Sequence, residues 1–186
     1  MERNNKFFNP LIVCFVTALV LGGTLIGTIF SMNNQEAQEI MKETVFFSGN
    51  FNEAFSNAFF KKLFWIIVFA TGGINIFLVP LALSGVVIKS YSYGFTSGCI
   101  VSSMGTYGYF TVLSGLFLQN FLFAVVSMLY TSYGINKSFE CFLNRRNYEC
   151  VSGKNKNFLL VSIIVLFSTL IISAVEGGIS VFLYDV

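Results

Sequence analysis

The chain has 186 residues, of which 55% are apolar and only 11% are charged, and its formal net charge is +2. A globular domain carries about 25% charged residues, so this composition argues against a soluble protein, and the small, scattered positive surplus argues against a nucleic-acid partner. The sequence contains no histidine and no phosphate-binding or dinucleotide motif. We therefore expect no enzymatic activity, no cofactor and no metal site. The four cysteines are expected to be reduced thiols.

Five stretches of the chain are apolar enough to form transmembrane helices. A helix needs about 20 apolar residues to cross the hydrocarbon core of a bilayer, and helices satisfy their backbone hydrogen bonds within one segment. The predicted spans, in chain order, are 11–31, 63–83, 85–103, 109–135 and 158–183. We therefore predict one membrane domain over residues 1–186, an all-α polytopic helical bundle.

The basic residues predict the orientation of this bundle. Two of them precede the first span, Lys89 lies in the third, and five lie in the loop 136–157, whereas only three lie in the loop 32–62. Because positive charge is retained on the cytoplasmic side, this distribution of eight against three predicts a cytoplasmic N-terminus and an extracytoplasmic C-terminus. The first span is too long for a signal-peptide core and lacks a cleavage site, so we expect it to stay as an anchor.

The extracytoplasmic loop 32–62 contains an apolar helical pattern. Asn50 and Glu53 resemble a helix-capping box, and Phe51, Phe55 and Phe59 recur every four residues on one face. One interpretation is a helix that lies along the outer membrane surface and docks an extracytoplasmic partner through these phenylalanines. The alternative is an early start of the second span.

Small residues mark two helix faces for close packing. The third span is predicted to be the centre of the bundle, because its face is lined by Ser90, Gly94, Gly98 and Ser102. In the first span, Gly23 and Gly27 form a similar stripe. Ordinary helix packing without a further role is the plainer interpretation of both stripes.

Several polar residues fall inside the predicted spans. Asn75, Gln119 and Asn120 are expected near the middle of their helices, where amides bond across to neighbouring helices. Lys89 is expected to extend to the cytoplasmic interface, and Pro80 to kink the second span. Glu176 lies near the outer boundary on a polar face of the last span; it either reaches headgroup water or is buried against the third span or a partner. We expect it to act through position and hydrogen bonding rather than proton transfer.

The order of several short motifs resembles the stage II sporulation protein M family. The matching stretches are Ser84–Val87, Gly94–Gly98, Met104–Phe110, Leu118–Asn120 and Ala174–Ser180. The resemblance implies a protein of the bacterial cell membrane without enzymatic activity, which anchors peptidoglycan hydrolases of the sporulation D and P type during septal thinning and engulfment. The wider family includes short members linked to circular bacteriocins, so an accessory subunit for bacteriocin maturation, export or immunity, working with a transporter ATPase, is the alternative. Membrane lipids are expected contacts in both cases.

Overall fold

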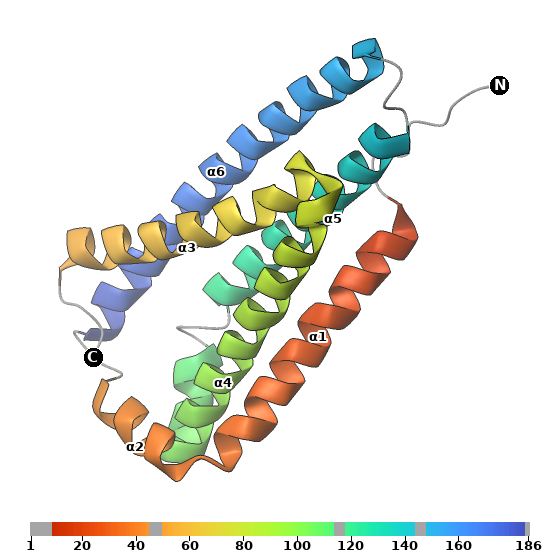
Figure 1. The fold of residues 1–186 in the computed structure, drawn as a ribbon. Helices are drawn as coiled ribbons and strands as arrows, with labels where there is room; N and C mark the ends of the chain where they lie inside the picture. The colour runs from red at the N-terminus through yellow and green to blue at the C-terminus, as the bar shows by residue number, and fades with distance from the viewer. Residues whose placement is uncertain (1–8, 45–49, 114–117, 144–147, 185–186) are drawn as a thin grey trace.

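The computed structural model is a bundle of long α-helices (Figure 1) and describes residues 9–44, 50–113, 118–143 and 148–184. No strand occurs among these residues, so the predicted all-α class is confirmed. The elements, in chain order, are α1 (Pro10–Met32), α2 (Gln35–Thr44), α3 (Phe51–Ile74), the 3₁₀ turn η1 (Ile76–Leu78), α4 (Val79–Thr111), α5 (Leu118–Leu143) and α6 (Tyr148–Tyr184).

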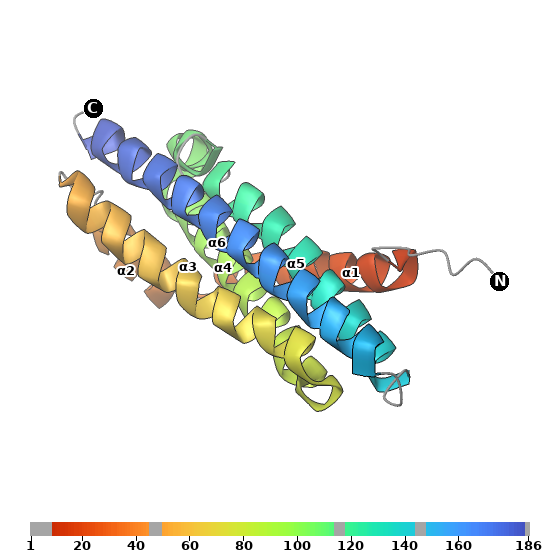
Figure 2. The same cartoon turned by 90° about the horizontal axis from the view of Figure 1, so that it is seen from above.

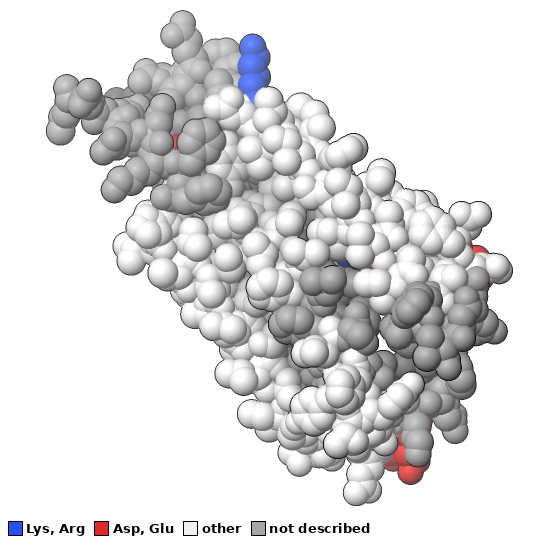
Figure 3. All heavy atoms as spheres, turned by 180° about the vertical axis from the view of Figure 1, so that it is seen from behind, with Lys and Arg blue, Asp and Glu red and all other residues white. Residues whose placement is uncertain are grey.

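The outside of the bundle is apolar. Among the described residues, four stretches are helical, long and apolar enough to cross a membrane: Pro10–Met32, Phe51–Ile74, Ile76–Phe110 and Asn155–Ile179. Large apolar side chains point outward, with Leu25 64% and Phe167 66% exposed. Figure 3 shows one broad face with charged residues visible mainly near its ends. Because water disfavours such a surface and lipid does not, the bundle has the character of a membrane protein.

The five long helices run between two ends of the bundle (Figures 1 and 2). One end holds the start of α1, the turn between α3 and α4, and the start of α6; we call it the Pro10 end. The other end holds α2, the start of α3 and the last turns of α6; we call it the α2 end. Five alternating passages fit the predicted topology, in which these two ends face opposite sides of a membrane.

The predicted second span, 63–83, is wrong as a single helix. Helix α3 begins at Phe51 and ends at Ile74, where Asn75 is extended (φ −147°, ψ 144°) and its side chain accepts a hydrogen bond from the Phe77 amide at 3.3 Å. Pro80 stands in the first turn of α4, where a missing N–H costs nothing, so it starts a helix instead of kinking one. The apolar pattern continues through this turn, which is why the sequence did not reveal it.

Within the described residues, the other predicted spans are helical but have different ends. The predicted span 85–103 lies within α4, the start of 109–135 belongs to α4, and α5 begins only at Leu118. Most of the predicted basic loop 136–157 is also helical, because α5 continues to Leu143 and α6 begins at Tyr148. Apolar runs mark the part of a helix that suits lipid, whereas α6, with 37 residues, is about 55 Å long and exceeds a hydrocarbon core of about 30 Å.

Helix α5 contains a fully enclosed stretch. Its residues 130–135 are six consecutive buried positions, so this part is covered on all sides. It contacts α1, α3, α4 and α6. In contrast, α4 leaves Ile88 56% exposed and Ser102 on the surface. Helix α4 also contacts α1, α2, α3 and α5, so the expectation that the third predicted span forms the centre stays a prediction; its small residues indicate a close neighbour on one face.

Helix α4 changes direction at Gly105. Its φ of 58° and ψ of −131° are not helical, and this conformation is disfavoured for any residue other than glycine. The following turn lies back against α4, since a Cβ on Gly108 would lie 2.5 Å from the Ile100 carbonyl oxygen. This turn presents Tyr107 (70% exposed) and Tyr109 (64% exposed) at the α2 end.

Candidate functional site

The two predicted stripes of small residues lie against each other in the interface between α1 and α4. A Cβ on Gly23 would lie 2.9 Å from the Ser90 Cβ, and one on Gly94 would overlap the Thr24 backbone. Thr28 donates a hydrogen bond across the interface to the Gly94 carbonyl at 3.3 Å. The two backbones therefore approach so closely that side chains cannot be added at these positions.

The remaining small residues of these stripes behave differently from one another. Gly27 is buried against the Tyr91 backbone, and Gly98 is buried against the Ser31 hydroxyl. Ser102, which the spacing places on the same face, is exposed. The interface thus ends about one turn before the expected position.

A charged pair joins α3 to α6. The Lys62 ammonium donates to the Glu176 carboxylate, and the Lys62 side chain is only 6% exposed, compared with 30% for Glu176. Glu176 therefore neither extends into headgroup water alone nor faces α4; it faces α3. Sequence reasoning missed Lys62 as a site residue because it was assigned to a solvent-exposed loop. The signal was present in its position next to the Phe51–Phe59 face of the same helix.

Lys89 was expected near a helix end. It lies instead ten residues inside α4. Its ammonium lies 4.6 Å from the centre of the Tyr93 ring and 5.5 Å from that of Trp65. Cation–π contacts of this kind contribute about 0.5–2 kcal/mol. The earlier start of α4 accounts for the difference, since the predicted span began six residues later.

Polar side chains of α5 close the end of α3. Lys137 donates to the Gly73 carbonyl at 2.8 Å, and Ser138 donates to the Gly72 carbonyl at 2.5 Å. The last carbonyls of a helix have no hydrogen-bond donor within the helix, and they form the negative end of its dipole. Lys137 and Ser138 supply the missing donors, and the Lys137 charge also complements the dipole. The Lys137 ammonium also lies 4.1 Å from the centre of the Phe158 ring of α6.

Three hydroxyls inside the bundle have no hydrogen-bond partner within the described part of the chain: Thr131, Ser132 and Ser173. Nearby, the Tyr130 and Ser162 hydroxyls bond to each other at 2.8 Å and join α5 to α6. None of the three bonds its own backbone one turn earlier, as a serine or threonine in a helix can. They make the interior polar without forming a catalytic set.

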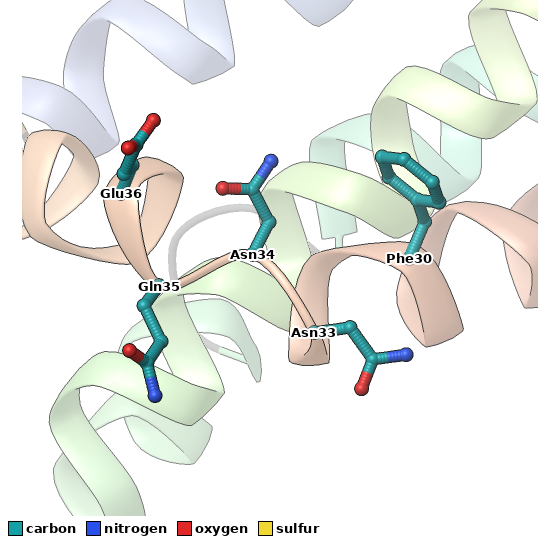
Figure 4. Close-up of a pocket in the computed structure, with 5 residues that line it drawn as sticks. All are labelled: Phe30, Asn33, Asn34, Gln35 and Glu36. Atoms are coloured by element: carbon teal, nitrogen blue, oxygen red, sulfur yellow. The ribbon is translucent and has the colours of Figure 1, made fainter.

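The α2 end is built by reciprocal capping between α1 and α2. Asn34 accepts a hydrogen bond from the Ala37 amide at 3.1 Å, and Gln38 donates to the Ser31 carbonyl at 2.8 Å. Both helix ends at this corner are therefore satisfied by side chains. A hollow of about 400 Å³ lies here, lined by Phe30, Asn33, Asn34, Gln35 and Glu36. In Figure 4, Asn34 and Glu36 point to the opposite side of the turn from Asn33 and Gln35.

The proposed docking face is partly occupied by the protein itself. Phe51, Phe55 and Phe59 stack in sequence, with ring centres 6.0 Å apart in each pair. A Cβ on Gly177 would lie 3.1 Å from Phe51 and 3.3 Å from Phe55, so this face packs on α6. The face belongs to α3 itself, as the early-start alternative supposed.

The predicted intramembrane amides do not meet at a common site. Asn75 ends α3 and caps the next turn instead of bonding across from the middle of a span. Asn120 is half-buried in the first turn of α5, not in its middle. The side chain of Gln119 lies outside the described residues. Asn75 and Asn120 lie at helix ends, and not in the middle of a span, because α3 ends at Ile74 and α5 begins only at Leu118.

The described residues hold no group of three or more histidine, cysteine or acidic side chains that could bind a metal. No family, no curated protein and no solved structure matches this chain.

Proposed function

We propose that this chain is a non-enzymatic membrane scaffold whose α2 end holds an extracytoplasmic partner. The observation that carries the proposal is the contrast between the interior and the α2 end. Inside the bundle, Lys62, Glu176, Lys137 and Ser138 bind other parts of the chain. At the α2 end, the connection between α1 and α2 and the turn after Gly105, which carries Tyr107 and Tyr109, are exposed.

The α2 end has the features of a docking surface. Glu36 and Glu39 are exposed on α2, and Tyr107 and Tyr109 are exposed on the turn after Gly105. Aromatic side chains at an interface supply most of the binding energy, and charges around them give specificity. Helix α2 contacts α4, which carries the turn after Gly105, so both groups lie at the same end of the molecule.

The motifs that resemble stage II sporulation protein M suggest which partner to test. On that proposal, the partners are peptidoglycan hydrolases of the sporulation D and P type, anchored during endospore formation. A second candidate is an accessory subunit for circular bacteriocin maturation, export or immunity. The observation that favours the second candidate is the set of charged and hydroxyl groups inside the bundle, since polar interiors are typical of transport proteins.

Site-specific photo-crosslinking in the native host tests the proposal. A photoreactive amino acid at Glu39 or Tyr109 probes the α2 end, and one at Lys156, which is exposed on α6 toward the Pro10 end, is the matched control. We expect adducts with cell-wall hydrolases from the first two positions and none from Lys156. Adducts with an ATPase from Lys156 alone would contradict the scaffold proposal and support the bacteriocin-linked one.

A further inference from the structure

The turn that joins α3 to α4, which we call the α3–α4 turn (residues 74–78), presents apolar side chains on the outside of the bundle. Ile74 and Phe77 are 69% and 80% exposed. No charged residue occurs in the sequence between Lys62 and Lys89, a stretch that has this turn near its middle. Contiguous exposed apolar surface marks a contact with a membrane, a ligand or another protein. The turn therefore suits an apolar environment better than water.

The protein itself satisfies the backbone of the α3–α4 turn. Two side chains of α5 donate to the last carbonyls of α3. The Asn75 side chain accepts from the Phe77 amide at 3.3 Å, and the Leu78 amide donates to the Asn75 carbonyl at 3.0 Å. Non-helical backbone at membrane depth requires such partners, because lipid offers none that could replace water. The turn meets this condition.

Helices α5 and α6 continue past the level of this turn. Phe158 of α6 packs against Gly73 in the last turn of α3, and α6 begins ten residues earlier, about 15 Å further out. Helix α5 runs five residues beyond Ser138, about 8 Å. Figure 1 shows the ends of both helices beyond the turn. Because the headgroup layer of one leaflet is about 5–8 Å thick, α5 and α6 are long enough to cross it while the turn stays beneath it.

Helix α1 places the turn at a boundary of the hydrocarbon core. Gly23 of α1 packs against Ser90 of α4. Pro10, where α1 begins, and Phe77 each lie thirteen residues before that contact, so they are at about the same level. The 23 residues of α1 are about 35 Å long, which matches a core of about 30 Å. The core therefore begins close to the level of the turn.

We propose that the α3–α4 turn is seated in the lipid leaflet at the Pro10 end, beneath the headgroups, with Ile74 and Phe77 among the acyl chains. The exposed Asn75 side chain lies at the boundary, where it faces the headgroup layer. Helices α3 and α4 thus form a hairpin that does not reach water at this end, whereas α5 and α6 do. This inference goes beyond the scaffold function and depends neither on it nor on which side of the membrane the Pro10 end faces.

Cysteine labelling in opened cells tests whether water reaches the turn. All four natural cysteines are replaced, and the chain carries Phe77→Cys or the matched control Lys156→Cys, both at exposed positions. A maleimide reacts with the thiolate, which apolar surroundings disfavour. We expect a water-soluble maleimide to label the Lys156 probe and to leave the Phe77 probe unlabelled until detergent dissolves the membrane. Labelling of the Phe77 probe in opened cells would overturn the proposal.

Fluorescence quenching tests whether lipid, and not another protein, covers the turn. Trp65 is the single tryptophan, so Trp65→Phe/Phe77→Trp and Trp65→Phe/Lys156→Trp each carry one reporter. In bilayers of the purified chain, phosphatidylcholine brominated on its acyl chains should quench the Phe77 reporter more, and aqueous iodide the Lys156 reporter more. The reverse order would contradict the proposal. A Phe77 thiol that is unlabelled in opened cells but labelled in these bilayers would also contradict it, because a protein partner would then cover the turn. If Trp65→Phe does not fold, the thiol labelling decides.

Discussion

Lys62 is held inside the bundle by a single carboxylate, and this makes Glu176 necessary for stability. Breaking a buried ion pair costs about 3–5 kcal/mol because one charge is left unpaired, and the cost is smaller here since Glu176 is 30% exposed. We expect Glu176→Gln and Glu176→Leu both to lower the melting temperature in detergent. The control, Glu53→Gln at an exposed position of α3, should not.

A double variant separates the effect of an unpaired Lys62 charge from the loss of the contact between Lys62 and Glu176. Lys62→Met/Glu176→Leu replaces the pair by apolar side chains, which a lipid-surrounded interior tolerates. It should melt at a higher temperature than Glu176→Leu alone. If the double variant melts lower than Glu176→Leu, an unpaired Lys62 charge is not what destabilises the Glu176 variant.

Lys137 is the second buried lysine, and its partner is a helix end. Lys137→Met leaves the Gly73 carbonyl without its donor, and an unsatisfied buried group costs about 1–3 kcal/mol. We expect faster hydrogen exchange of the amides in the turn 75–78, measured by mass spectrometry in detergent. Lys156→Met serves as the control. Unchanged exchange in Lys137→Met would show that Ser138 alone closes the end of α3.

At the scale of elements, the contact between α1 and α4 depends on missing side chains. Gly94→Leu should separate the helices and lower the amount of folded protein in the membrane, because its Cβ would overlap the Thr24 backbone. Gly22→Leu is the matched control on α1, since a Cβ there meets nothing within 4 Å. Equal abundance and melting temperature in the two variants would contradict this packing.

The helix ends show what a sequence alone can and cannot predict. The number of long helices follows from apolar length, and the close-packing stripes that contain Gly23 and Gly94 follow from the spacing of small residues. That these two stripes face each other was not predicted. The break at Asn75 could not be read from that pattern, since its neighbours are as apolar as those of a span. The position of Lys62 beside the Phe51–Phe59 face indicated a buried side, but its partner Glu176 could not be predicted, because the pair joins residues 114 positions apart.

At the scale of the whole molecule, the account depends on which side of the membrane each end faces. The proposed docking surface lies at the α2 end, and the basic residues predict that this end is extracytoplasmic. Cysteine labelling tests this most directly, with all four natural cysteines replaced and single probes placed at Glu39 or Lys156. In intact cells, a membrane-impermeant maleimide should label the Glu39 probe and leave the Lys156 probe unlabelled until the cells are opened. Labelling of the Lys156 probe from outside, or of both probes equally, would contradict the arrangement.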